Sequence, residues 1–210
     1  MSHYFVDDPD LRSERRSFDY TFGNEHFTFT TDLGVFSKEH VDFGSYLLIR
    51  YVLGLPLGGK ILDLGCGFGP IGIILKRFFP EAEIDLVDVN PRAVELSRLN
   101  AAANRADVQV CLTDDITTLQ KHYHSILLNP PIRAGKATIY GLYEKSREVL
   151  YPGGTLYIVI RKKQGAESTI RKLKELFNDA EVLAKDSGYW ILRAVKADAQ
   201  HLPYERTAHQ

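Results

Sequence analysis

The sequence predicts an α/β fold built on a doubly wound sheet of seven mostly parallel strands, with an antiparallel C-terminal hairpin and a short N-terminal β-hairpin extension. Short apolar runs alternate with segments of helical spacing from Lys60 onward, and two of these segments open with Pro70 and Pro91, which suit a first helical turn. Strands that alternate with helices form parallel sheets covered on both faces. Near the C-terminus, two apolar runs flank a turn signal at 186–188, which would add antiparallel strands at an edge.

The chain before the sheet divides into an arm and a hairpin. Residues 1–16 are polar, carry Pro9 and show no period, so we expect a flexible N-terminal arm. Residues 17–40 alternate apolar and polar positions around Gly23-Asn24 and continue into the loop LGVFSKEH, which predicts the hairpin extension. Residues 41–197 would form the α/β domain, and 198–210 a C-terminal tail.

Within the α/β domain, each element follows from its pattern. Apolar runs bounded by glycine, proline or acidic residues predict strands at 60–65, 83–90, 107–114 and 125–131, and the stretch 151–160 (YPGGTLYIVI) predicts a turn followed by a strand. Helical spacing predicts helices at 41–54, 70–79, 91–104, 138–150 and 166–177. The alternating run 180–195 predicts the closing hairpin.

Composition narrows the class of protein. The net charge of −1 excludes a general polycation, so a nucleic-acid partner would need a local basic patch. Cys66 and Cys111 form no CxxC pair, so we expect no metal site and a reducing, cytoplasmic location. No apolar run approaches the ~20 residues of a membrane span, so we expect no membrane association.

The glycine-rich stretch LDLGCGFGPIG is the strongest chemical signal. Gly65, Gly67 and Gly69 alternate between a predicted strand and a predicted helix, with Asp63 just before them and Asp88 ending the next strand. The spacing is GxGxG, whereas a pyrophosphate site is expected to have GxGxxG, and Gly-Lys-Ser/Thr is absent. Asp88 can accept hydrogen bonds from ribose hydroxyls. The ligand is therefore expected to carry a ribose and no phosphate, and Asp63 would favour a positively charged group.

The motifs DLGCGFG, VDVN, LTDD and NPPI, in this order, resemble class I S-adenosylmethionine-dependent methyltransferases. With the lead-in GVFSKEHVDFGSYLL, they are similar to the small methyltransferase domain group, which contains bacterial ribosomal RNA guanine-N2 methyltransferases, and the resemblance runs from about Phe18 to about Lys196. It implies a Rossmann-like catalytic domain over 41–197 and S-adenosyl-L-methionine as cofactor. The residues that it implies for cofactor binding are Asp63, Gly65, Cys66, Gly67, Asp88, Val89, Asp114, Asp115 and Asn129. A turn cap remains the alternative for Asp114 and Asp115.

Asn129, Pro130 and Pro131 are the predicted catalytic residues. They end the strand HSILL, where ligands of such sheets bind. A planar amino group is a poor nucleophile, because its lone pair is delocalised. The Asn129 side-chain oxygen and the Pro130 carbonyl, stiffened by Pro131, could each accept one N–H and direct the lone pair at a methyl group. A simple strand end with a proline turn is the alternative, and the glycine loop argues against it.

The predicted substrate is a guanine in ribosomal RNA, free or in an assembling ribosomal subunit. The predicted substrate-binding residues are Phe36, Ile132, Arg133, Lys136, Lys162 and Lys163. Ile132 stands where many family members have an aromatic residue, so Phe36 is the candidate for stacking, with a core role as its alternative. The basic residues would form a rim for RNA, and their alternative is solubility charge. Adenine, protein glutamine, a nicotinamide oxidoreductase and a non-catalytic cofactor-binding module remain open, as does the oligomeric state.

Overall fold

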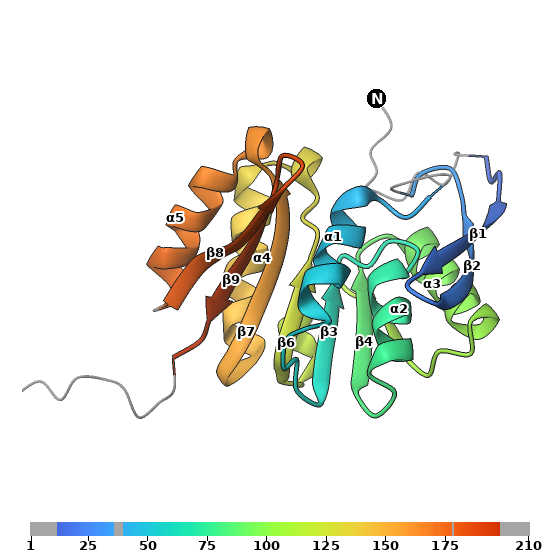
Figure 1. Ribbon diagram of the computed structural model, residues 1–210, viewed down its shortest axis with the longest axis horizontal. Coiled ribbons are helices and arrows are strands. Elements are labelled where there is room, and N and C mark those ends of the chain that lie inside the picture. Colours follow the sequence, from blue (N-terminus) through green and yellow to red (C-terminus); the bar gives the residue numbers. More distant parts are fainter. Residues whose placement is uncertain (1–11, 36–39, 178, 198–210) are drawn as a thin grey trace, which may run out of the picture.

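The computed structural model describes residues 12–35, 40–177 and 179–197 (Figure 1). The strands are β1 (Arg16–Phe22), β2 (Glu25–Thr31), β3 (Lys60–Leu64), β4 (Glu83–Asp88), β5 (Gln109–Leu112), β6 (Tyr123–Leu128), β7 (Leu150–Arg161), β8 (Asp179–Asp186) and β9 (Tyr189–Val195). The helices are α1 (Phe43–Val52), α2 (Pro70–Phe78), α3 (Pro91–Ala103), α4 (Lys136–Val149) and α5 (Ala166–Leu176). Short 3₁₀ helices are η1 (Ile116–Leu119), η2 (Ile132–Ala134) and η3 (Lys162–Gln164).

A seven-stranded sheet in the order β5-β4-β3-β6-β7-β9-β8 confirms the predicted fold class. The first five strands in this order run parallel, and β9 runs antiparallel to both β7 and β8. A separate antiparallel sheet of β1 and β2 confirms the N-terminal hairpin. The strand order reverses between β3 and β6, and open α/β sheets bind ligands beyond the carboxyl ends of the strands at such a point.

Helices cover both faces of the sheet, as the alternation of strands and helices predicted. Leu47 of α1, Ile73 of α2 and Leu96 of α3 belong to one buried apolar cluster. Tyr143 of α4 and Leu173 of α5 belong to a second cluster. The sheet contributes alternate residues of each strand to the two clusters, because successive side chains of a strand point to opposite faces.

Most element boundaries differ by a few residues from the sequence-based expectation, and three of the differences affect the description of the site or the sheet. β5 ends at Leu112 because the hydroxyl of Thr113 donates to the Asp115 carbonyl (3.0 Å) and closes a turn. β7 includes the stretch that reads as a turn, since Gly153 N donates to the Lys196 carbonyl (2.8 Å) and extends the strand. Helix α4 begins two residues earlier than expected, at Lys136, so this residue lies in its first turn.

The hairpin is attached to α3 through two asparagines. Asn100 exchanges hydrogen bonds with the backbone N–H and carbonyl of Thr30 (2.7 and 2.8 Å), and Asn104 does the same with Thr28 (3.0 and 2.8 Å). The spacing of the two asparagines along α3 matches that of the two threonines along β2, because four helical residues rise about 6 Å and two strand residues about 6.8 Å. Asn100 also donates to the Phe68 carbonyl (2.8 Å), so the hairpin is linked to the glycine loop.

Two predicted segments, the tail and the arm, fall wholly or largely outside the described residues. The tail at 198–210 lies entirely outside them, and the arm at 1–16 is described only from Arg12. The described end of the arm is held by Asp32, which accepts hydrogen bonds from the Ser13 hydroxyl (2.7 Å) and the Glu14 backbone N–H (2.6 Å).

Candidate active site

The carboxyl ends of four parallel strands bring the predicted site residues to one edge of the sheet. The glycine loop follows β3, Asp88 ends β4, Asp114 follows β5 and Asn129 follows β6. These strands are neighbours in the order β5-β4-β3-β6 and run parallel, so residues at their ends lie along one line. This edge is at the top of Figure 1.

Gly65 and Gly67 open the loop toward a ligand. Their φ angles are 71° and 59°, in the left-handed region that favours glycine, and a Cβ atom added at either would meet no atom within 4 Å. At Gly69, in contrast, an added Cβ would lie 2.9 Å from Ile73 Cδ1, so this glycine serves packing. Cys66 points inward: it is buried, and its sulfur lies 3.4 Å from the Ser97 hydroxyl. The side of the glycine loop that is open to a ligand therefore presents backbone atoms.

Two acidic side chains lie under this loop. Asp88 accepts hydrogen bonds from the backbone N–H groups of Gly67 (2.8 Å) and Asn90 (2.9 Å). Asp63 Oδ2 accepts from Gly72 N–H (2.9 Å), whereas its buried Oδ1 has no partner in the described part of the chain. Burial raises the pKa of Asp63 to about 7, and it also raises the pKa of Asp88. A ligand with a cationic group would satisfy Asp63, so this set of groups fits the predicted cofactor.

Apolar surface lies beside these acids. Val89, directly after β4, is 44% exposed, and Leu112, the last residue of β5, is 51% exposed. The two residues come from neighbouring strand ends and would suit the flat face of a purine. Leu112 was not among the residues predicted from the sequence. A large apolar residue just before Thr-Asp-Asp, at the end of a predicted strand, could have indicated it.

Asp114 and Asp115 differ in what their side chains do. The Asp115 carboxylate accepts hydrogen bonds from the backbone and hydroxyl of Thr117 (3.1 and 2.8 Å) and lies 3.4 Å from Lys145 Nζ. The bonds from Thr117, more than the nearby Lys145, lower the pKa of Asp115. Asp115 thus has the capping role considered as its alternative. Asp114 is exposed, and its carbonyl accepts a hydrogen bond from Lys145 Nζ (3.1 Å), while its carboxylate has no partner among the residues that the structure describes. Ligand contact by either aspartate stays a prediction.

The Asn129 side chain is held by two residues that the sequence analysis missed. Its amide nitrogen donates to Asp42 Oδ2 (2.9 Å) and to the Ser45 hydroxyl (3.0 Å). A carboxylate only accepts, so the amide must present its nitrogen to Asp42 and leave its oxygen for another donor. Asp42 also caps α1 by accepting from Ser45 N–H (3.1 Å). The Asp-x-x-Ser spacing at a helix start was the available signal.

The two prolines after Asn129 have different surroundings. Pro130 is buried, and its carbonyl has no hydrogen bond in the ranges that the structure describes. The Pro131 carbonyl accepts from Ala134 N–H (2.9 Å) and opens η2. Ile132 packs partly buried against the apolar cluster under α4. An acceptor carbonyl at Pro130 is thus available beside Asn129.

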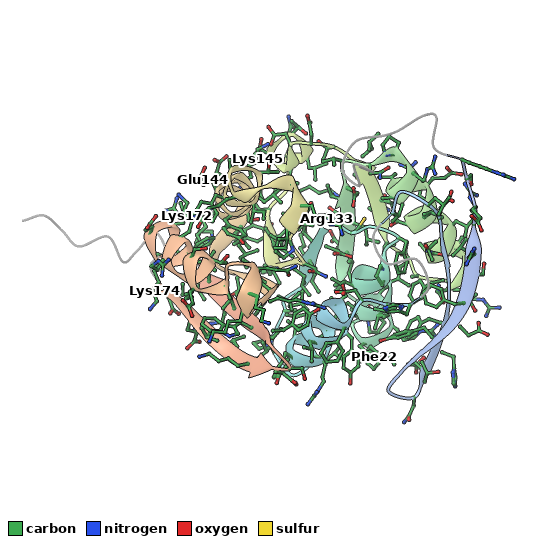
Figure 2. The ribbon with its side chains drawn as sticks, turned by 90° about the horizontal axis from the view of Figure 1, so that it is seen from above. Phe22, Arg133, Glu144, Lys145, Lys172 and Lys174 are labelled. Carbon is green, nitrogen blue, oxygen red and sulfur yellow. The ribbon has the colours of Figure 1, made fainter. Side chains whose placement is uncertain are left out.

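The predicted basic residues lie at the same edge. Arg133 and Lys136 follow β6, Lys162 and Lys163 follow the parallel strand β7, and all four are exposed. Figure 2 looks down on this edge and places Arg133 near the middle of the molecule, with Lys145 on the α4 side. We call these four residues the basic rim. Phe36 lies outside the described residues, so its role stays a prediction.

Neither metal ligands nor a membrane helix are found in the parts of the chain that the structure describes. No group of three or more His, Cys, Asp or Glu side chains there could hold a metal ion. No helix there is both long and apolar enough to cross a membrane.

Comparison with known proteins gives a consistent result. Residues 26–193 match the family model of the methyltransferase small domain. The chain is 46% identical over 197 residues to the uncharacterized protein YbxB of Bacillus subtilis (strain 168), covering 92% of this chain and 98% of that one. It is 36% identical over 170 residues to ribosomal RNA small subunit methyltransferase C of Stutzerimonas stutzeri (strain A1501), covering 78% of this chain and 49% of that protein.

A solved structure supports the same relationship. The Thermus thermophilus 16S rRNA N2 G1207 methyltransferase (RsmC), in complex with AdoMet and guanosine, superimposes with a TM-score of 0.78 at 27% identity, over 91% of this chain and 53% of that one. The chain thus spans about half the length of the ribosomal RNA methyltransferases that it resembles.

Proposed function

Since the chain belongs to the methyltransferase small domain family and is an S-adenosylmethionine-dependent methyltransferase, we propose that it methylates the exocyclic 2-amino group of a guanine in ribosomal RNA. The observation that carries the proposal is the Asn129 amide, whose nitrogen is bonded to Asp42 and Ser45 and whose oxygen remains for the target amine. Family membership argues against the nicotinamide oxidoreductase and against a non-catalytic module.

The cofactor side of the site uses the glycine loop and its acids. S-adenosylmethionine would supply an electrophilic methyl group when bound. The open backbone at Gly65 and Gly67 allows close approach of its methionine part, and buried Asp63 attracts a positive charge. Asp88 would accept from the ribose hydroxyls, since a carboxylate offers about four lone pairs and backbone N–H groups use only some of those of Asp88. Val89 and Leu112 would contact the adenine ring.

The acceptor side orients the amine. Asn129 Oδ1 and the Pro130 carbonyl accept one N–H each, which aims the nitrogen lone pair at the methyl carbon. The lone pair forms the new C–N bond while the C–S bond breaks and its electrons go to sulfur. The same two oxygens stabilise the positive charge that develops on nitrogen, and one N–H proton then leaves to water. The burial of Pro130 and the double anchoring of Asn129 keep these acceptors in place before the substrate arrives.

RNA as the substrate rests on the relatives and on the basic rim. The named relatives are ribosomal RNA methyltransferases. The rim residues Arg133, Lys136, Lys162 and Lys163 follow the ends of β6 and β7, and so share the sheet edge with Asn129, on a chain whose net charge is only −1. Cationic side chains there would contact phosphates next to an unpaired or flipped-out guanine. Adenine and protein glutamine are the competing acceptors.

Methyl transfer to ribosomal RNA tests the proposal. Ribosomal RNA and ribosomal subunits from a strain lacking this gene are incubated with the protein and methyl-labelled S-adenosylmethionine, and the modified nucleotide is identified by mass spectrometry. We expect N2-methylguanosine at one position. Label found only in adenine or in protein would overturn the guanine assignment.

An Asn129→Ala variant tests the proposed role of the Asn129 amide oxygen. Turnover should fall about 10²–10³-fold, because one preorganised acceptor is lost, while cofactor affinity persists. Gln109→Ala, which truncates an exposed amide at the amino end of β5, is the matched control and should retain turnover. Near wild-type turnover of Asn129→Ala would remove Asn129 from the reaction.

A further inference from the structure

The Asp42 carboxylate lies beside the proposed acceptor with one oxygen unused. Its Oδ2 accepts hydrogen bonds from Asn129 Nδ2 (2.9 Å) and from Ser45 N–H (3.1 Å). Its Oδ1 has no hydrogen bond or ion pair with any residue that the structure describes, and the side chain is only half-buried. A helix cap and an anchor for Asn129 need one oxygen, so the second is available to a ligand.

The start of α1 is packed tightly around this carboxylate. A Cβ atom added at Gly44 would lie 2.9 Å from Asp42 Oδ2 and 3.0 Å from Tyr189 Cε1, so a side chain at this position would displace one of these two groups. Tyr189 is itself buried and accepts a hydrogen bond from Arg161 Nε (2.6 Å) at the end of β7. The carboxylate is therefore held by two hydrogen bonds, one from Ser45 in the first turn of α1 and one from Asn129 after β6, and the Tyr189 ring of β9 lies against the neighbouring Gly44.

Guanine and adenine differ in the atom next to their exocyclic amine. In guanine, the 2-amino group adjoins N1–H, so two neighbouring groups donate hydrogen bonds. In adenine, the 6-amino group adjoins an unprotonated N1, which accepts. A carboxylate accepts only, so beside Asn129 it pairs with guanine and repels adenine.

We propose that Asp42 is a specificity-determining residue, whose Oδ1 accepts the N1–H of the target guanine while Asn129 Oδ1 accepts an N–H of its 2-amino group. The inference rests on the proposed function and deepens it, because it identifies the group that selects guanine. A charge-assisted hydrogen bond of this kind corresponds to roughly 10- to 100-fold in affinity.

Two nucleosides probe this contact. Guanosine and 2-aminopurine riboside both carry a 2-amino group, but the second has an unprotonated N1 and also lacks the 6-oxo group. The change in their affinity ratio on substitution of Asp42, and not the ratio alone, therefore reports the contact. Their affinities for the full chain are measured in the presence of S-adenosylhomocysteine. The wild type should prefer guanosine by at least about tenfold. Asp42→Asn should reduce this preference by about tenfold, since its oxygen must face Ser45 and Asn129 and its NH₂ then faces the purine N1.

Controls separate recognition from structure. Ser45→Ala removes one hydrogen bond that holds Asn129. It should weaken the binding of both nucleosides alike and leave the ratio of their affinities unchanged. Should Asp42→Asn fail to fold, 1-methylguanosine provides a second test with the wild type. Its N1 carries a methyl group in place of the proton, which removes the hydrogen bond and adds bulk, so equal binding of the two nucleosides would exclude the contact. We expect at least a tenfold loss relative to guanosine.

The outcomes are distinct. An unchanged nucleoside ratio in folded Asp42→Asn, or equal binding of guanosine and 1-methylguanosine, would overturn the role of Asp42 and leave guanine methylation standing. If the wild type neither binds guanosine nor methylates guanine in ribosomal RNA, both the proposed function and this inference fail.

Discussion

Replacing Asp63 with Asn should stabilise the ligand-free protein at pH 8 and at the same time weaken cofactor binding. The Asp63 carboxyl is 1% exposed and its Oδ1 lacks a partner in the described chain. Burial, with a smaller contribution from Asp88, raises the pKa of Asp63 to about 7. Above this pH the folded protein must hold a buried negative charge, which an amide of the same shape avoids.

The magnitude follows from this pKa. A folded-state value above the unfolded value means that the stabilisation is complete below about pH 4 and is lost as pH rises to about 7. At roughly 1.4 kcal/mol per pH unit, Asp63 alone should cost roughly 4 kcal/mol across this window. Asp63→Asn lacks this dependence, so urea unfolding from pH 4.5 to 8 should give two stability curves that diverge as pH rises.

For cofactor affinity, the order of the two proteins should be reversed, with the wild type above Asp63→Asn. The ionised Asp63 carboxylate attracts a cation, so the wild-type affinity for S-adenosylmethionine should increase between pH 5.5 and 7, whereas Asp63→Asn should bind more weakly and without this pH dependence. Isothermal titration calorimetry measures both. Asp107→Asn, which changes an exposed aspartate between α3 and β5, is the matched control. Parallel unfolding curves for wild type and Asp63→Asn would refute the reasoning.

The remaining predictions concern the ribose, the rim and the hairpin. Asp88→Ala should lower cofactor affinity about 10- to 100-fold in calorimetry, because a charge-assisted contact is lost; equal affinity would exclude Asp88 from the site. The double variant Lys162→Ala/Lys163→Ala should weaken RNA binding at many sequences alike and flatten its dependence on salt, with cofactor affinity unchanged; identical salt slopes would mean that RNA binds elsewhere. Asn100→Ala/Asn104→Ala should leave β2 backbone groups unpaired, at about 1–3 kcal/mol each, and increase hydrogen exchange in β2; unchanged protection would show that other contacts hold the hairpin.

Most of the fold was predictable because it depends on local patterns. The alternation of apolar runs and helical segments determined the strands, and prolines at the first helical turn located the starts of α2 and α3. The parallel arrangement then required the ends of β3, β4, β5 and β6 to share one edge. The glycine loop, Asp88 and Asn129 could therefore be grouped from their positions alone.

The errors in the elements also have local reasons. The Gly153-Gly154 stretch reads as a turn, yet it pairs with Lys196, more than 40 residues away in sequence, and so belongs to β7. From the sequence, Asp115 could be predicted equally well as a turn cap or as a ligand contact, since both need an acidic residue at a strand end. Its bond to Thr117 and its pairing with Lys145 became visible only in the structure.

By itself, the sequence determined which residue types stand at the carboxyl edge of the sheet, because strand period, turn chemistry and motif spacing are properties of neighbouring residues. Only the tertiary structure decided which atoms of those residues form hydrogen bonds within the protein. Asp42 lies 87 residues from Asn129 along the chain. Their hydrogen bond exists because α1 packs against β7 and β9, which brings the start of the helix to the end of β6. Contacts between distant segments depend on packing, which no local pattern encodes, and in this protein such a contact sets which atom of the Asn129 amide is bonded to Asp42 and Ser45.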